Sequence, residues 1–309
     1  MAFASFTRFM RSRLFPPSDP VASLEGKTVL VTGGSSGLGL EAAIKFINLG
    51  VSLLIIGCRS IERGNEAKKL IEQRTNRTRT GLIQIWPLEM NDYRSVMAFA
   101  ERVNNEVPRL DIALLNAGVH SRYYTLSAEG WEQDIQVNAL STALLGLLLL
   151  PKLRASRDPQ TDGAAHLSFV SSGSYRLVTA DRLWPPREED GSSSEGSSIL
   201  DHLNKRENFV KRGQYALSKL LLEYVVKNVA RLTRRDDGTV EVIVNSICPG
   251  ACRSGLTRDY TAFHERLALM IAQILFTRTA EQGSRSLVSG TLLGEESHGK
   301  LWKNDEFPE

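Results

Sequence analysis

Tyr215 and Lys219 are the two residues whose types and spacing point most directly to chemistry. They lie four positions apart in a stretch, residues 215–231, with the apolar period of a helix, so both side chains should share one face. A free tyrosine titrates at about 10, too high for proton transfer at neutral pH, and a neighbouring ammonium group lowers that pKa by favouring the phenolate. We therefore predict that Tyr215 transfers a proton with the assistance of Lys219.

Ser172 is a candidate partner for these two residues. It follows a short apolar run, residues 165–170, that predicts a strand. Its hydroxyl could donate a hydrogen bond to a substrate oxygen that gains negative charge during the reaction. The alternatives are that Tyr215 and Lys219 form an ordinary surface pair and that Ser172 is a turn residue.

A glycine-rich loop, TGGSSGLG at residues 32–39, follows the first predicted strand. Glycines there permit a tight turn, the close approach of a phosphate and the packing of a helix on a strand, where a Cβ would interfere. The N–H groups and the dipole of the helix that begins here can hold a pyrophosphate. The predicted dinucleotide-binding residues are Gly33, Ser35, Ser36, Gly37, Leu38 and Gly39.

The end of the second predicted strand indicates which dinucleotide binds. An acidic residue at this point holds the ribose 2′-hydroxyl of NAD, whereas an arginine accommodates the 2′-phosphate of NADP. Here Arg59 follows the strand, and the next carboxylate is Glu62. We therefore predict NADP(H) as the cofactor, and the alternative interpretation of Arg59 is a solvated loop charge.

Short β-branched runs alternate with helical periodicity along the chain, which is typical of βαβ units. This predicts an α/β fold with one Rossmann-type, doubly wound parallel sheet of about seven strands. The predicted strands are residues 27–32, 51–56, 82–88, 112–115, 165–170 and 240–247, and the predicted helices are 40–49, 61–74, 93–107, 129–153 and 215–231.

Two irregular stretches interrupt this alternation. Residues 179–213 are rich in Ser, Gly, Pro and charge, and residues 251–280 replace a tight turn with a helical excursion. Loops of this length inside a compact domain are usually functional or disordered. We expect a single domain at 26–300 that contains both stretches, an N-terminal extension at 1–25 and a C-terminal tail at 301–309.

The composition excludes several classes of partner. The formal net charge of +3 is too small to indicate a nucleic-acid partner. Three cysteines make no disulfide framework, and Cys248 and Cys252 enclose Pro249 and Gly250 with no histidine nearby, so no metal site is expected. The longest apolar run, residues 143–150, falls short of the roughly 20 residues that span a bilayer and predicts a buried helix. We expect a small-molecule ligand and no transmembrane segment.

Residues 1–17 contain three arginines and aromatic residues at roughly helical spacing. The preferred interpretation is a short amphipathic helix at the domain edge of a cytoplasmic protein, ended by Pro16 and Pro17. The alternatives are a mitochondrial transit segment or a helix at a membrane surface.

Over about residues 25–300, these motifs together resemble the short-chain dehydrogenase/reductase family. The motifs, in the family's order, are TGGSSGLG at 32–39, NAG at 116–118, VSS at 170–172, YALSK at 215–219 and PG at 249–250. The resemblance implies oxidation or reduction at CH–OH and C=O groups with a nicotinamide cofactor. It also implies a cationic nicotinamide beside Tyr215 and, as a further possibility, a homodimer.

The resemblance also implies roles for residues that spacing alone does not single out. Asn138 would anchor a water of the proton relay, Asn116 would line the nicotinamide ribose, and Glu89 would contact adenine. Lys219 would also hold the ribose hydroxyls. In the family, a threonine often binds the carboxamide of the nicotinamide. Here Ser254 or the backbone would make that contact. A satisfied buried amide is the alternative interpretation of Asn138.

The spacing between Ser172 and Tyr215 is longer than in the family's shorter members. In this respect the chain is similar to retinol-dehydrogenase-like members and to dehydrogenases of fungal secondary metabolism. The similarity implies a bulky, hydrophobic small-molecule substrate, with residues 179–213 and 251–280 as lids. The alternative functions are a catalytically silent NADP-binding regulator and a C=C reductase or lyase on the same scaffold.

Overall fold

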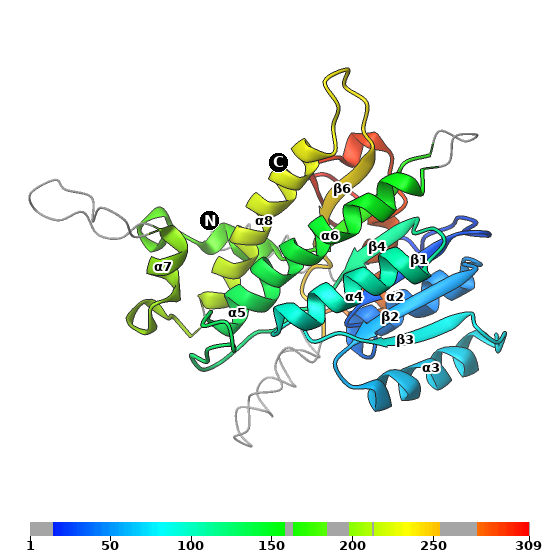
Figure 1. The fold of residues 1–309 in the computed structure, drawn as a ribbon, viewed down its shortest axis with the longest axis horizontal. Helices are drawn as coiled ribbons and strands as arrows, with labels where there is room; N and C mark the ends of the chain where they lie inside the picture. The colour runs from blue at the N-terminus through cyan, green and yellow to red at the C-terminus, as the bar shows by residue number, and fades with distance from the viewer. Residues whose placement is uncertain (1–14, 158–162, 184–197, 212, 254–276, 309) are drawn as a thin grey trace, which may run out of the picture.

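The structure, a computed structural model, describes residues 15–157, 163–183, 198–211, 213–253 and 277–308. Its centre is a seven-stranded sheet in the order β3-β2-β1-β4-β5-β6-β7, in which every neighbouring pair is parallel. Helices cover both faces of the sheet (Figure 1). The predicted Rossmann-type, doubly wound sheet is therefore confirmed.

The strands are short and largely buried, as expected of parallel strands covered on both faces. Their bounds are β1 Thr28–Thr32, β2 Leu53–Cys58, β3 Ile83–Pro87, β4 Ile112–Leu115, β5 Ala165–Val170, β6 Val242–Ile247 and β7 Leu301–Trp302. Successive residues of β1 enter different cores: Leu30 packs toward one face, and Val29 and Val31 toward the other. This alternation follows from the two-residue period of a strand.

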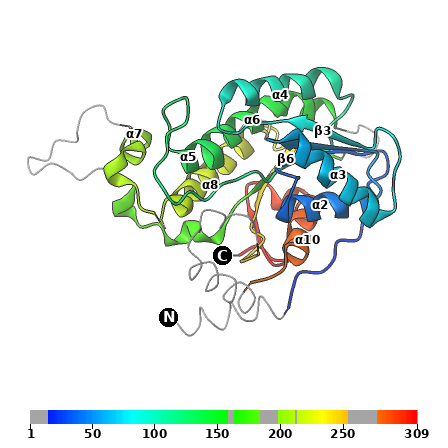
Figure 2. The ribbon, with the colours of Figure 1, turned by 90° about the horizontal axis from the view of Figure 1, so that it is seen from below.

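Two layers of helices sandwich the sheet (Figure 2). One layer contains α4 Tyr93–Glu106, α6 Thr142–Ala155 and α8 Gln214–Leu232, and the other contains α2 Gly37–Asn48, α3 Ile61–Thr75 and α10 Ala280–Gly290. Phe99 and Phe169 belong to the core beneath the first layer, and Phe46 and Leu287 to the core beneath the second. Each layer is thus fixed by its own hydrophobic core.

The strand order reverses between β1 and β4, because the chain continues from β1 to β2 and β3 on one side and to β4 on the other. At such a point the following loops diverge and leave a crevice at the carboxyl ends of the strands. The glycine-rich loop after β1 and the NAG sequence after β4 both lie there.

The helix predicted over residues 129–153 differs from the one observed. The observed helix begins at Gln133 instead of residue 129. Its first part, α5 Gln133–Ile135, continues through a π-helical turn, Gln136–Ser141, into α6. The combined helix, Gln133–Ala155, is long and apolar enough to cross a membrane by length and composition, but 67% of its most apolar window is buried inside the protein. It is therefore the core helix that the sequence predicted.

Strand boundaries also differ from the predictions. β2 begins at Leu53 rather than at residue 51, because Val51 ends the preceding turn with its N–H bonded to the Phe46 carbonyl. β7, Leu301–Trp302, lies in the segment that the sequence pattern left outside the domain. Two residues are too few to show the period of a strand.

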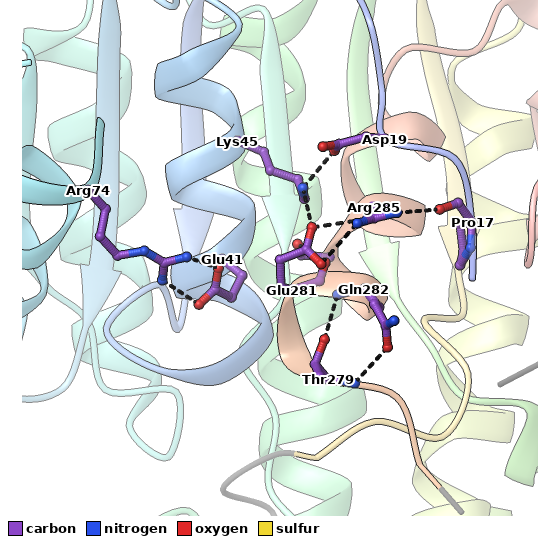
Figure 3. A network of polar contacts seen from close by, with 10 residues as sticks. Pro17, Asp19, Glu41, Lys45, Arg74, Thr279, Glu281, Gln282 and Arg285 are labelled. Atoms are coloured by element: carbon purple, nitrogen blue, oxygen red, sulfur yellow. Dashed lines mark hydrogen bonds and ion pairs between the residues drawn. The ribbon is translucent and has the colours of Figure 1, made fainter. Parts of the chain in front are cut away.

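The segment before β1 is tied to the back of the domain through the polar network of Figure 3. The Lys45 ammonium contacts Asp19 at 2.6 Å and Glu281 at 2.8 Å. Arg285 pairs with the same Glu281 and donates to the Pro17 carbonyl at 3.2 Å. Residues 15–19 therefore pack on α2 and α10, whereas most of the helix predicted within residues 1–17 lies outside the described residues.

The long insert before α8 contains ordered elements in its described part. These are single turns at Ala180–Arg182 and Arg206–Asn208 and the helix α7, Ile199–Asn204. The Ser198 hydroxyl and the Asp201 side chain cap the first turn of α7 reciprocally. Figures 1 and 2 show α7 at the end of the molecule that holds α5 and the start of α8.

Candidate active site

A cavity of about 450 Å³ opens at the carboxyl ends of the central strands. The glycine-rich loop forms one wall, and the ends of β2 and β3 extend it toward Arg59 and Glu89. Ser172, Tyr215 and Lys219 lie at the opposite wall, with Asn116 between the two. The cavity therefore contains every residue predicted for catalysis or dinucleotide binding except Asn138, which lies just behind it, and Ser254, which lies outside the described residues.

The backbone of the glycine-rich loop explains its composition. Gly33 and Gly37 have φ angles of +66° and +55°, in the left-handed region that favours glycine. A Cβ at Gly39 would lie 2.5 Å from both the Asn116 amide nitrogen and the Gly33 carbonyl oxygen. The loop can therefore turn tightly, and the start of α2 can approach β1 and β4 closely, only with glycine at these positions.

Asn116 and Thr32 join the ends of β4 and β1. The Asn116 side-chain amide donates to the Thr32 carbonyl at 2.9 Å, and the Ala117 N–H donates to the Thr32 hydroxyl at 2.9 Å. These bonds fix the NAG sequence against the glycine loop. Asn116 thus reaches the cavity from a rigid support.

Arg59 and Glu89 lie at the far end of the cavity from Tyr215. Their side chains form an ion pair with an N–O distance of 3.8 Å, and the Arg59 side chain is 70% exposed. Arg63, on the first turn of α3, lines the same end, as do Ser60 and Glu62. This end of the cavity therefore presents two guanidinium groups on a partly exposed surface.

Tyr215 and Lys219 face the cavity from the first turns of α8, as their spacing predicted. The Lys219 ammonium lies 5.8 Å from the centre of the Tyr215 ring and donates to the Val170 carbonyl at 2.8 Å. Burial lowers the pKa of Lys219 to about 8, although the nearby charges of Glu223 and Asp134 raise it. Lys219 is therefore a buried cation that gives up its proton more readily than an exposed lysine.

Burial raises the pKa of Tyr215 above its ordinary value, while a hydrogen bond with Ser172 lowers it. The expectation that Lys219 lowers this pKa is not met by the groups of the protein alone, because desolvation of the phenolate dominates. At neutral pH the side chain is thus a phenol that can donate a proton.

Ser172 ends the turn after β5 and begins a short 3₁₀ helix, Gly173–Leu177. Its hydroxyl oxygen accepts hydrogen bonds from the Ser174 N–H at 3.3 Å and the Ser174 hydroxyl at 3.0 Å. The turn interpretation and the catalytic interpretation are therefore compatible, since the turn directs the hydroxyl toward Tyr215.

Asn138 lies in the π-helical turn and is fully buried. Its amide nitrogen donates to the Val119 carbonyl at 2.8 Å and to the Ser218 hydroxyl at 2.9 Å, and its oxygen accepts the Val119 N–H at 2.8 Å. Both amide hydrogens are thus used within the protein. Asn138 connects the loop after NAG to the residue that precedes Lys219.

Two residues of the site were not identified from the sequence: Arg63, which lines the cavity, and His120, which contacts Tyr215. The His120 ring stacks on the Tyr215 ring with a centroid distance of 4.9 Å and an interplanar angle of 31°. His120 lies two residues after the NAG sequence, and Arg63 lies four residues after Arg59. These short offsets are the only signals that could have found them. Ser254, proposed for the carboxamide contact, lies outside the described residues.

A family model described as short chain dehydrogenase matches residues 27–172. A short-chain dehydrogenase/reductase of Phaeosphaeria nodorum, phmF, is 44% identical over 98% of this chain and 85% of its own length. Another of Aspergillus flavipes, ffsI, is 41% identical over 99% of this chain and 85% of its own length.

Solved structures show the same fold at low sequence identity. A short chain dehydrogenase structure from Pseudomonas syringae covers 94% of this chain with 23% identity and a TM-score of 0.65. It is itself covered over 99% of its length. One from Shigella flexneri, described as complexed with NADP, covers 93% of this chain and 100% of its own, with 21% identity and a TM-score of 0.60.

Proposed function

Because the chain belongs to the short-chain dehydrogenase/reductase family, we propose that it transfers a hydride between NADP(H) and a ketone or secondary alcohol of a hydrophobic small molecule. The family membership makes it an oxidoreductase that uses a nicotinamide cofactor. The proposed reaction and cofactor rest on one observation. Ser172, Tyr215 and Lys219 lie together at one end of a cavity, and the glycine loop and Arg59 lie at the other end.

The residues present fit a dinucleotide. The glycine loop forms a cradle that a Cβ at Gly39 would fill, and the N-terminus of α2 points its free N–H groups into it. Asn116 and Lys219 would lie along the nicotinamide ribose. Glu89, whose carboxylate accepts the Asn91 N–H at 2.9 Å, would lie near the adenine.

The preference for NADP(H) rests on Arg59 and Arg63, which line the end of the cavity near β2. Two guanidinium groups can bind a 2′-phosphate through charge-assisted hydrogen bonds. The ion pair with Glu89 would then reorganise so that Arg59 faces the phosphate. The NADP in the Shigella flexneri structure is consistent with this proposal.

When bound, the cofactor supplies or accepts the hydride, and the protein handles the proton. In the reduction, Ser172 donates a hydrogen bond to the carbonyl oxygen while Tyr215 gives that oxygen its proton. Lys219 remains largely protonated at neutral pH and stabilises the resulting phenolate. Asn138 would contribute a water contact through its remaining acceptor capacity or its backbone, because its amide hydrogens are occupied.

The proposed substrate class and setting follow from the relatives, which are fungal, and from the insert before Tyr215. We place the enzyme in secondary metabolism in the cytoplasm, with the insert shaping a bulky apolar binding site. The outer face of α6 and α8 exposes Leu147 and Tyr224, which would suit a homodimer.

The test compares Tyr215→Phe with Tyr224→Phe, a half-exposed tyrosine nine residues further along α8. Purified protein is assayed for NADPH oxidation with a panel of bulky ketones, and product NMR identifies the reduced group. We expect Tyr215→Phe to lose turnover and keep NADPH affinity, and Tyr224→Phe to behave as wild type. Near-native turnover by Tyr215→Phe, or products saturated at C=C with the carbonyl retained, would contradict the proposal.

A further inference from the structure

The described part of the insert is docked against the helix that carries Tyr215. Leu203 of α7 packs with Ile135 of α5 and Leu217 of α8, and all three side chains are buried. Ile199 also packs against this cluster. The end of α7 is thus fixed beside the first turns of α8.

Asn204, the last residue of α7, makes the polar contacts of this interface. Its side-chain oxygen accepts the Glu132 N–H at 2.7 Å, and its side-chain nitrogen donates to the Gly130 carbonyl at 2.8 Å. The Tyr124 hydroxyl donates to the Asn204 carbonyl at 2.8 Å. One asparagine of the insert therefore holds the turn that leads into α5.

The Glu132 side chain continues this connection into the protein. It is fully buried, and its oxygens accept the Asp134 N–H at 3.1 Å and the Ile135 N–H at 3.2 Å, which caps α5. One oxygen also accepts from the Gln214 amide at 2.9 Å. Among the described residues the carboxylate has no cationic partner, and these three donors stabilise it.

Gln214 is the first residue of α8 and directly precedes Tyr215. We propose that Asn204, at the surface of the interface, and the buried Glu132 and Gln214 form a hydrogen-bonded relay that fixes Tyr215. The insert would then control the proton-transfer residue through Glu132 as a positioning residue. The relay explains why a buried carboxylate lies here without touching the cavity, since Glu132 is not among the residues that line it. The inference rests on the proposed function of Tyr215.

The first test measures the relay without any substrate. Asn204→Ala removes the bonds of its side chain to Glu132 and Gly130, and Gln214→Leu removes the bond to Glu132. The control, Asn208→Ala, removes the contacts of Asn208 with the His202 carbonyl and ring elsewhere in the insert. Hydrogen–deuterium exchange is followed in the peptide that covers the first turn of α8. We expect about tenfold faster exchange there in the two relay variants, as for the loss of one buried hydrogen bond. The last turns of α8 and the Asn208→Ala protein should match wild type.

The second test separates positioning from general loosening. Turnover is measured with NADPH and phenanthrenequinone, and NADPH affinity by nicotinamide fluorescence. We expect Asn204→Ala and Gln214→Leu to lower kcat about tenfold with NADPH affinity within about twofold of wild type. The double variant should lose little more than either single variant, because both changes interrupt one relay.

Unchanged exchange in both relay variants would overturn the relay, as would parallel losses of kcat and NADPH affinity. If wild type does not reduce phenanthrenequinone, the exchange result alone decides. Failure of the proposed function is recognised separately, by retained turnover of Tyr215→Phe or by products saturated at C=C. A dead Tyr215→Phe enzyme beside fully active Asn204→Ala and Gln214→Leu would leave the function standing and the relay wrong.

Discussion

Two buried lysines, on helices that cover opposite faces of the sheet, have contrasting surroundings. Lys45, at the back of α2, contacts two carboxylates, Asp19 and Glu281 (Figure 3). Lys219, in the cavity, donates to a backbone carbonyl, and among the described residues no carboxylate forms an ion pair with it. The first arrangement matches charge with charge and stabilises the fold, whereas the second leaves the ammonium facing the cavity, as the proposed proton transfer requires.

The carboxylates of the two regions show the same contrast. Burial favours a higher pKa for Glu281, but hydrogen bonds from Arg285 and Lys45 outweigh it and lower the pKa overall. Burial raises the pKa of Asp134, near Lys219, to about 7. Neutralising Lys45 should therefore destabilise the folded protein, whereas neutralising Lys219 or Asp134 in the active site should stabilise it. This difference is expected where activity and stability conflict.

The largest effect should come from Lys219→Met. Turnover should fall about 10²- to 10⁴-fold, the range for loss of assisted proton transfer, while the thermal midpoint rises because a desolvated ammonium is removed. Steady-state kinetics and calorimetry test both. Lys227→Met, at an exposed position of the same helix, should change neither. A lower thermal midpoint for Lys219→Met would show that Lys219 stabilises the folded protein, as Lys45 does.

Asp134→Asn should stabilise the protein increasingly with pH. The raised pKa means that the folded state binds a proton more tightly than the unfolded state, so the aspartate weakens folding as pH rises from about 4 to about 7. The gain of the variant should grow across that window and then level off at about 4 kcal/mol. Chemical denaturation at several pH values measures it. Asp92→Asn should show the opposite sign, because the Arg94 N–H lowers the pKa of Asp92.

Lys45→Met should destabilise the protein by about 1–2 kcal/mol, because Asp19 loses its ion pair and Glu281 keeps only Arg285, and both carboxylates are partly exposed. Urea denaturation gives the value. Turnover should stay within about twofold of wild type, since Lys45 does not line the cavity. If Lys45→Met raised the free energy of unfolding, Lys45 would destabilise the folded protein as Lys219 does, and the contrast would be wrong.

Arg74→Met should have the smallest effect. Arg74 forms a bidentate pair with Glu41 in the same region, but its side chain is 41% exposed and the pair is screened by solvent. We expect a loss of about 0.5 kcal/mol that shrinks at high salt. Denaturation at two salt concentrations tests it, and a salt-independent loss would indicate packing rather than charge.

The sequence predicted those parts of the site that depend on local geometry. Tyr215 and Lys219 share a face because a helix brings every fourth residue together. The glycine loop was identified because a strand before it and a helix after it leave few other conformations. The parallel sheet followed from the alternation of buried strands and amphipathic helices.

The sequence could not predict contacts between residues far apart along the chain. Asn204 lies 72 positions from Glu132, and Glu132 lies 82 from Gln214, so no period or motif connects them. The stacking of His120 on Tyr215 depends equally on the packing of separate elements. β7 pairs with β6 through two residues only, which is below the length at which a pattern can be recognised.

The π-helical turn at Gln136–Ser141 sets the phase between the two halves of its helix. Each residue of an α-helix advances the direction of the side chain by about 100°. Deleting one residue from the turn would therefore rotate Asn138 away from Val119 if Leu145, Leu149 and Leu153 kept their places in the core. A single extra residue thus lets one helix present an apolar stripe to the sheet and an amide to the active site.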